Sequence, residues 1–267
     1  MVQNKEKTLS SVAEASANGT AQPAAAKAKA PDKQETKASD FRKERKYVIE
    51  GFDIAQVEAV VKSHPALFSV PFPPRYINNI YFDTREFRNY RDNVAGSTNR
   101  EKFRIRWYGD QYGEVKKPVL EVKIKRGLAG TKKYAPLSNV TLKPGFSMND
   151  IEAWLDQSDL SPEYREAMKY LQPSLHNRYR RKYFLSANKK FRLTLDDQLT
   201  YVDIPKLNGF FTHREMERGK VVMEIKYDTE DDLNASWLTD HLPFRLSKNS
   251  KYVIGVKKLD IWNLHEW

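Results

Sequence analysis

Alternating apolar and charged residues recur in five short segments of the chain. In a β-strand this alternation places apolar side chains on one face and charged, mostly basic, side chains on the other. The segments are Glu44–Tyr47, Phe103–Trp107, Leu120–Lys125, Phe191–Asp196 and Val222–Lys226. If these strands share one sheet, that sheet has an apolar face and a cationic face.

The same pattern and its turn residues predict the other elements. We expect strands at 44–50, 77–83, 101–109, 118–126, 132–142, 180–186, 190–197, 199–204 and 220–227. Helices are expected near 54–63, 148–157, 162–171 and 230–241, with N-caps at Asp53, Ser147, Ser161 and Thr229. Many strands joined by short links predict an α+β fold, an antiparallel sheet or barrel with helices packed outside.

Residues 1–40 differ in composition from the rest of the chain. They are rich in alanine and contain no aromatic residue. Such a segment buries too little apolar surface to offset the entropy of ordering, so we expect a disordered tail followed by one folded domain over 41–267. The basic and acidic residues of the tail nearly cancel, so the net charge of +11 belongs almost entirely to 41–267.

The composition of the chain and the motifs that it lacks limit the ligands and reaction types that are possible. The positive charge predicts an anionic partner, either nucleic acid, an anionic membrane or a phosphate-rich small molecule. Absence of cysteine excludes disulfides, thiolate nucleophiles and cysteine-ligated zinc. No Gly-rich phosphate loop and no RNA-binding module are present, which argues against nucleic acid and requires side chains to bind phosphate. No apolar run is long enough to span a membrane and the start lacks a secretory core, so cytoplasmic location is the default.

The charged strand positions have two interpretations. In most antiparallel sheets such positions only face solvent. Here, however, cations recur in phase, and inside a closed barrel they would require an anion, because unpaired buried charges are very costly. Glu121 and Glu224 lie in phase with these cations and could bind Mg²⁺ or Mn²⁺ together with phosphate, or form salt bridges. Farther along, Lys248 and Lys251 would share one helix face if their segment is helical.

Several strings resemble the VTC domain, the catalytic domain of the vacuolar transporter chaperone complex, in the triphosphate tunnel metalloenzyme superfamily. The resemblance covers roughly residues 41–260 in consistent order. Its strings are Arg75–Thr84, Arg104–Gly109, Leu120–Lys123, Tyr179–Arg181, Arg192–Asp196, Met223–Lys226 and Ser247–Tyr252.

The resemblance implies an eight-stranded antiparallel tunnel, closed as a barrel, that binds a triphosphate and a divalent metal. It implies transfer of the ATP γ-phosphate to a growing inorganic polyphosphate chain. Arg104, Arg106, Lys123, Lys248 and Lys251 would be catalytic, and Glu224 would hold Mn²⁺ or Mg²⁺. The implied phosphate-binding residues are Lys46, Arg104, Arg106, Lys123, Lys133, Arg181, Arg192, Lys248 and Lys251.

Two other functions remain open at this stage. One is a triphosphatase or polyphosphatase, in which water attacks the phosphate with help from a carboxylate. The superfamily's Glu-x-Glu-x-Lys signature is present only as Glu44-Arg-Lys46, which weighs against a simple triphosphatase. The other is a module that binds polyphosphate without catalysis. The expected partners are ATP and inorganic polyphosphate, and the sequence does not identify protein partners.

Overall fold

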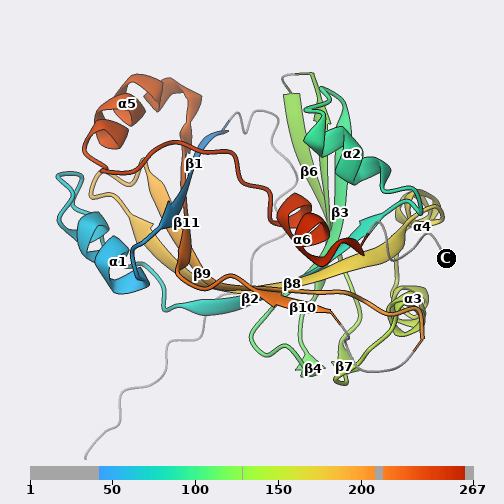
Figure 1. The fold of residues 1–267 in the computed structure, drawn as a ribbon. Coiled ribbons are helices and arrows are strands. Elements are labelled where there is room, and N and C mark those ends of the chain that lie inside the picture. Colours follow the sequence, from blue (N-terminus) through green and yellow to red (C-terminus); the bar gives the residue numbers. More distant parts are fainter. Residues whose placement is uncertain (1–41, 128, 208–212, 262–267) are drawn as a thin grey trace, which may run out of the picture. The chain divides into compact units, whose positions relative to one another are not determined.

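The computed structural model describes residues 42–127, 129–207 and 213–261. The tail predicted at 1–40 lies outside these residues. Most of the described chain belongs to one antiparallel sheet with helices around it (Figure 1). The prediction of an α+β fold is therefore confirmed.

The large sheet has eight strands in the order β1-β11-β9-β8-β2-β3-β5-β6, and a short ninth, β10, pairs with β9. No pairing between β1 and β6 is found among the described residues, so closure into a barrel stays a prediction. The bounds are β1 Arg42–Glu50, β2 Arg75–Asp83, β3 Arg100–Tyr108, β5 Val119–Arg126, β6 Ala129–Pro136, β8 Gln172–Leu185, β9 Arg192–Val202, β10 Arg214–Met216 and β11 Lys220–Asp228. The short strands β4 (Gly113–Val115) and β7 (Val140–Leu142) form a separate pair.

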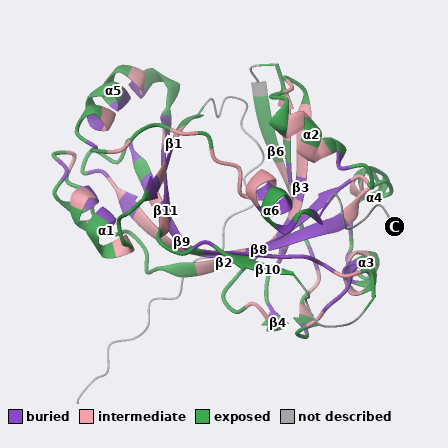
Figure 2. Cartoon of the chain, in the orientation of Figure 1, coloured by how far each residue is buried: buried purple, intermediate pink, exposed green. Residues whose placement is uncertain are grey.

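Four helices cover the apolar face of the sheet in two groups. Helices α1 (Ile54–Lys62) and α5 (Asp232–Asp240) pack on β1, β9 and β11, and α3 (Met148–Asp156) and α4 (Pro162–Met168) pack on β2, β3 and β5. Buried residues concentrate where these layers meet, and the far sides of the helices are exposed (Figure 2). The helices of these two groups therefore leave the charged face of the sheet uncovered.

The predicted helix starts agree with the structure at three of four positions. Asp53 and Ser147 form capping boxes, and Ser161 precedes a helix that begins at Pro162. Thr229 instead opens a short 3₁₀ turn, Thr229–Asp231, and the N-cap of α5 is Asp231. The prediction of Thr229 as the N-cap was wrong.

Strand boundaries differ from the prediction where the backbone is irregular. The two strands predicted at 190–197 and 199–204 are one strand, β9, in which Gln198 adopts a positive φ of 53°. The pairing with β8 shifts at this point, between Arg178 and Arg180. A bulge therefore accounts for the apparent break. The strand predicted at 132–142 is divided between β6 and β7.

Helix α2 (Arg88–Val94) was not predicted. Helix α6 (Lys251–Leu259) was considered only as a possible helix carrying both Lys248 and Lys251, and only Lys251 lies in it. Helix α6 packs on the same face of the sheet as Arg104. A Cβ at Gly255 of α6 would lie only 2.5 Å from Leu175 Cδ2. Leu175 is directly opposed to Tyr81, and Tyr81 is directly opposed to Arg104, so all three side chains lie on the charged face. The Tyr252 hydroxyl of α6 donates to the buried carboxylate of Asp83. The expectation that all helices lie outside is therefore wrong for α6.

None of the helices within the described ranges combines the length and apolarity required to span a membrane.

Candidate phosphate-binding face

Strand register places most of the predicted cations on one face of the sheet, which we call the charged face. Directly opposed residues of neighbouring strands point to the same side. Arg104 opposes Glu121, Lys46 opposes Glu224, and Arg181 opposes Asp196. The two-residue alternation of the sequence is thus preserved across the sheet.

The sheet curls toward its charged face. In a flat sheet, β1 and β5 would lie roughly 29 Å apart, at about 4.8 Å for each strand step. Lys123 of β5 nevertheless interacts electrostatically with Glu44 and Lys46 of β1, and Lys132 of β6 interacts with Lys226 of β11. The two arms of the sheet stand on either side of α6 in Figure 1. Charges on the two arms therefore lie close enough to influence one another, which a flat sheet would not allow.

Arg104 and Arg106 share the carboxylate of Glu121. The Arg104 Nε and Nη2 atoms lie 2.7 and 2.5 Å from Glu121 Oε2, and Arg106 Nη1 lies 3.1 Å from Oε1. Although burial opposes both charges, the ion pair raises the pKa of Arg104 and lowers the pKa of Glu121. Arg106 also donates from Nε to Asn79 Oδ1 at 3.0 Å. Glu121 therefore orients the arginines and has little capacity left for a metal ion.

A second cluster connects β8, β9 and α6. Asp196 is fully buried and accepts two hydrogen bonds from Arg181, at 2.6 and 2.7 Å. Its Oδ2 atom also lies 2.7 Å from Lys251 Nζ, which sits 4.6 Å from the centre of the Tyr179 ring. Burial disfavours the Asp196 charge, but the two cations outweigh it and lower the pKa. One carboxylate thus holds two predicted phosphate-binding residues in place.

Glu224 lies among cations of β1 and β11. Burial again opposes its charge, whereas Lys226, Lys46 and Arg181 hold its pKa well below the usual range. The Glu44 carboxyl group is within hydrogen-bonding reach of Glu224 and lies 2.5 Å from Lys46 Nζ. Glu224 is therefore ionised at neutral pH, in the state that a metal ion requires.

The acidic residues fit a divalent ion only in part. No group of three or more His, Asp or Glu side chains that could hold a metal occurs in the described ranges. Glu44 and Glu224 supply two carboxyl groups, and Mg²⁺ is commonly held by one or two carboxylates together with substrate phosphates. The pair therefore fits an ion that arrives with a phosphate ligand.

Three lysines form a row across adjacent strands. Lys102 of β3 opposes Lys123 of β5, which opposes Lys132 of β6. Like charges in opposed positions are unfavourable. Desolvation and neighbouring cations lower the pKa of Lys102 to about 7 and that of Lys132 to about 8. The row is a site that an anion would stabilise.

Three further predicted phosphate-binding residues, Lys133, Arg192 and Lys248, lie outside the clusters described above. Lys133 lies on the opposite face of β6 and pairs with Glu163 at 2.5 Å, so the prediction that it joins the charged face was wrong, and Lys132 occupies that position. Arg192 is exposed and lines a small cavity of about 50 Å³ with Lys226. Lys248 is exposed in the loop before α6.

Sequence reasoning missed the roles of Asp196, Glu44, Lys102 and Lys132. Glu44, Lys102 and Asp196 lie at alternate positions of strands already identified as charged, so the phase of the strand was the available signal. Lys132 lies in a strand that was predicted without any charge alternation. Asp196 was assigned to a strand only, because nothing in the sequence connects it to Arg181 or Lys251.

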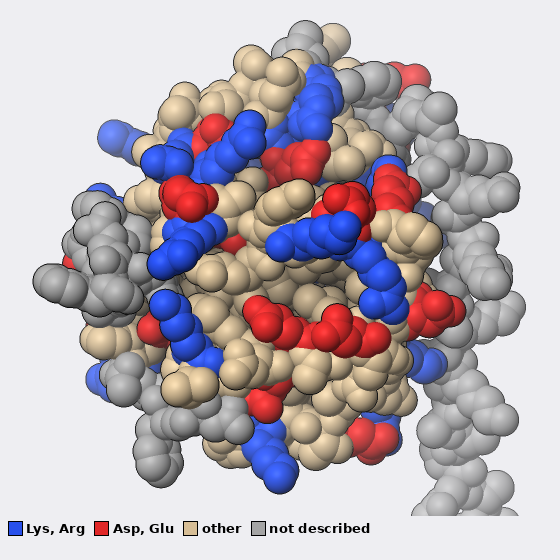
Figure 3. All heavy atoms as spheres, turned by 90° about the vertical axis from the view of Figure 1, so that its right-hand side faces the viewer, with Lys and Arg blue, Asp and Glu red and all other residues tan. Residues whose placement is uncertain are grey.

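The side of the molecule drawn in Figure 3 carries charges of both signs. In the view of Figure 3, Lys and Arg side chains are interspersed with Asp and Glu, so this side shows no extended patch of one sign.

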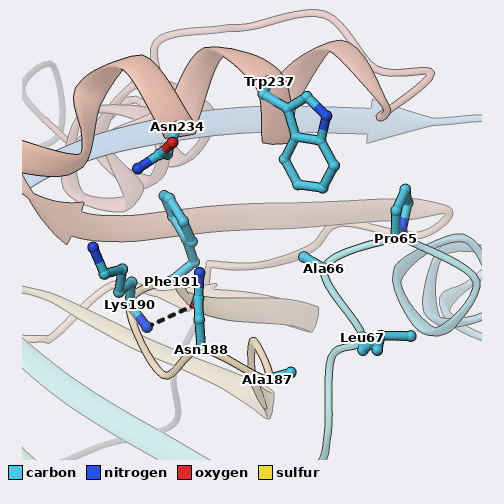
Figure 4. Close-up of a pocket in the computed structure, with 9 residues that line it drawn as sticks. All are labelled: Pro65, Ala66, Leu67, Ala187, Asn188, Lys190, Phe191, Asn234 and Trp237. Atoms are coloured by element: carbon cyan, nitrogen blue, oxygen red, sulfur yellow. Dashed lines mark hydrogen bonds between the residues drawn. The ribbon is translucent and has the colours of Figure 1, made fainter.

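A hollow of about 360 Å³ lies between α5, the β8–β9 turn and the segment after α1. Trp237, Phe191 and Leu67 border it together with Lys190 (Figure 4). None of the predicted site residues lines this hollow.

Comparison with known proteins gives one informative match. No curated relative matches the sequence. Solved structures resemble the chain weakly. A protein from Pyrococcus horikoshii OT3 has 12% identity and a TM-score of 0.43, with 80% of this chain and 96% of that chain covered, and a putative adenylate cyclase from Vibrio parahaemolyticus has 15% identity and a TM-score of 0.42, with 80% and 97% covered. A putative adenylyl cyclase from Hippeastrum, described as having a dominant triphosphatase activity, has 13% identity and a TM-score of 0.43, with 81% of this chain and 96% of that chain covered. Residues 41–260 match the model of the VTC domain, and the chain belongs to the VTC domain family.

Proposed function

We propose that this protein is a metal-dependent polyphosphate polymerase, which transfers the γ-phosphate of ATP to the end of an inorganic polyphosphate chain. The observation that carries the proposal is the convergence of cations from both arms of the sheet on the curled charged face. Membership of the VTC domain family supports it. The proposal includes closure of β1 toward β6, so that the charged face lines a tunnel.

The phosphates would bind to side chains that are already oriented. Glu121 holds Arg104 and Arg106, and Asp196 holds Arg181 and Lys251. Arginine offers paired donors that match phosphate oxygens, and lysine adds point charges. Since the ion pairs exist before the ligand arrives, little side-chain ordering remains for the binding step.

In the transfer step, a terminal oxygen of the polyphosphate acceptor forms a bond to the γ-phosphorus of ATP. The bond from that phosphorus to the β,γ-bridging oxygen breaks, and ADP leaves with the electron pair. The transition state carries charge spread over the equatorial oxygens, so positioning and charge neutralisation do most of the catalysis. Arg104, Arg106 and Lys123 are the residues that we assign to this role.

Glu224, with Glu44 beside it, would hold the Mn²⁺ or Mg²⁺ ion. Such an ion neutralises charge on the phosphate oxygens to which it binds. Lys46 and Lys226 flank the two carboxylates and would contact the same phosphates. Metal and lysines together would offset the negative charge of the triphosphate.

The direct test is product analysis with purified protein, ATP and Mn²⁺. We expect ADP and polyphosphate chains whose length grows with time, seen by gel electrophoresis and ³¹P NMR. Release of free phosphate without chain growth would instead indicate a hydrolase. Binding of polyphosphate that survives Glu224→Ala, without turnover of any phosphate compound, would indicate a binding module.

Polyphosphate affinity should fall as the pH rises above 7. The pKa of Lys102 is lowered to about 7 by desolvation and by Lys123, Arg100, Lys46 and Arg104. Among the described residues, its Nζ has one hydrogen-bond partner, the Ser250 hydroxyl at 3.4 Å. A bound polyanion favours the ammonium form, so binding takes up a proton near neutral pH. The wild type should bind polyphosphate about tenfold more tightly than Lys102→Met at pH 6, as expected for a charge-assisted contact.

The measurement is titration calorimetry of both proteins from pH 6 to 9. The ratio of the two affinities should approach one at pH 9, where Lys102 is neutral in the free protein. Comparing the two proteins at each pH cancels the ionisation of the ligand itself. A ratio that does not change with pH would contradict the prediction.

A further inference from the structure

A cluster of aromatic rings surrounds one arginine at the N-terminal end of β2. The Arg75 guanidinium carbon lies 4.9 Å from the centre of the Tyr108 ring, 5.0 Å from Tyr183 and 5.8 Å from Phe72. Phe72 and Tyr183 also contact each other edge to face, at 6.0 Å. We call these four residues the aromatic rim.

The aromatic rim continues the charged face. Tyr108 follows Arg106 by two positions on β3, and Tyr183 follows Arg181 by two positions on β8, so each shares the face of its arginine. Arg75 is directly opposed to Arg181. The rim is therefore adjacent to the arginines that we assign to the phosphates.

The rim is not part of the apolar core. Phe72 is 56% exposed and Tyr108 is 50% exposed. Arg75 is also exposed, and in the described part of the chain no carboxylate lies within ion-pair distance of it. Its charge rests only on ring faces, an arrangement that holds the guanidinium and the rings in place by cation–π attraction. The result is a set of flat, solvent-accessible surfaces held at fixed positions.

Flat aromatic and guanidinium surfaces bind nucleobases by stacking, and such stacking tolerates different bases because every base has a π-face. A nucleoside triphosphate carries its base at one end of the phosphate chain. If the phosphates lie on Arg106 and Arg181, the base extends past them along the strands, toward Tyr108 and Tyr183. Inorganic polyphosphate has no ring that could stack on Tyr108, Tyr183 or Phe72.

We propose that the aromatic rim binds the base of the nucleoside triphosphate, with Tyr108 and Arg75 as the residues that favour a nucleotide over an inorganic triphosphate. This inference rests on the proposed function for the position of the phosphates. It predicts a preference for purine over pyrimidine nucleotides, because larger rings stack more strongly.

The experiment compares ATP with tripolyphosphate as ligands of the same proteins, by titration calorimetry at one fixed salt concentration. Tyr108→Leu removes the π-face and keeps an apolar side chain, whereas Tyr108→Phe keeps the ring. Arg75→Ala tests the guanidinium. Tyr170, which is 76% exposed and lies beyond α4, provides the control Tyr170→Leu.

We expect Tyr108→Leu to weaken ATP binding about tenfold and to leave tripolyphosphate binding unchanged. Arg75→Ala should weaken ATP binding more than tripolyphosphate binding, because both ligands lose a nearby charge but only ATP loses a stacking surface. Tyr108→Phe and Tyr170→Leu should bind both ligands as the wild type does. Equal losses for the two ligands, or no loss for either, would overturn the inference. If the wild type bound neither ligand, the phosphate site of the proposed function would itself fail, and the two failures are thus distinguishable.

Discussion

Arg104→Ala is expected to lower the rate of polyphosphate synthesis by at least about a hundredfold, the usual cost of removing one preorganised donor from a charged transition state. The loss has two sources. The variant lacks the guanidinium that faces the phosphates, and Glu121 loses the partner that holds it at 2.5 and 2.7 Å. With only Arg106 left as its ion-pair partner, the Glu121 carboxylate then repels nearby phosphates more strongly.

The measurement is the initial rate of chain growth at saturating ATP and Mn²⁺, together with the affinity for tripolyphosphate. Lys133→Ala is a matched control, because it removes a cation from the same domain on the face opposite to the site. Synthesis by Lys133→Ala should equal that of the wild type. Should Arg104→Ala retain normal synthesis, the assignment of the charged face as the catalytic site would be untenable.

Asp196→Ala is expected to lower the free energy of unfolding by about 3–5 kcal/mol, the range seen when one member of a buried ion pair is removed. Asp196 is fully buried, and its loss leaves Arg181 and Lys251 side by side without the carboxylate that both of them contact. It also removes the ion pair that connects the start of α6 to β9. Urea denaturation followed by circular dichroism measures the change.

Asp228→Ala is the control for this prediction. Asp228 forms an ion pair with Arg42 at 3.3 Å, but its side chain is 69% exposed. Exposed pairs contribute at most about 1 kcal/mol, so this variant should unfold almost as the wild type does. Added tripolyphosphate should recover part of the stability of Asp196→Ala, because phosphate oxygens can replace the missing carboxylate. Equal stability of the two variants without ligand would contradict the role of Asp196.

Much of the charged face could be predicted because strand periodicity is local. Arg104 and Arg106 must share a side whenever their segment is a strand, and the same holds for Glu224 and Lys226. Capping residues such as Asp53 and Ser147 likewise act within one helical turn, so the starts of α1 and α3 were correct. Periodicity does not say which residues of one strand share a face with which residues of the next strand. That relation is set by the hydrogen-bonded register between the strands.

The sequence by itself determined the alternation of charge along each strand, the absence of cysteine chemistry and the antiparallel α+β class. The tertiary structure decided that Lys132, and not Lys133, shares the face of Lys123, because a shift of one residue in register exchanges the two sides of a strand. It also decided that Asp196 joins Arg181 to Lys251, residues far apart in the chain, and that α6 lies on the charged face. These features depend on long-range packing, which no local pattern of residues encodes.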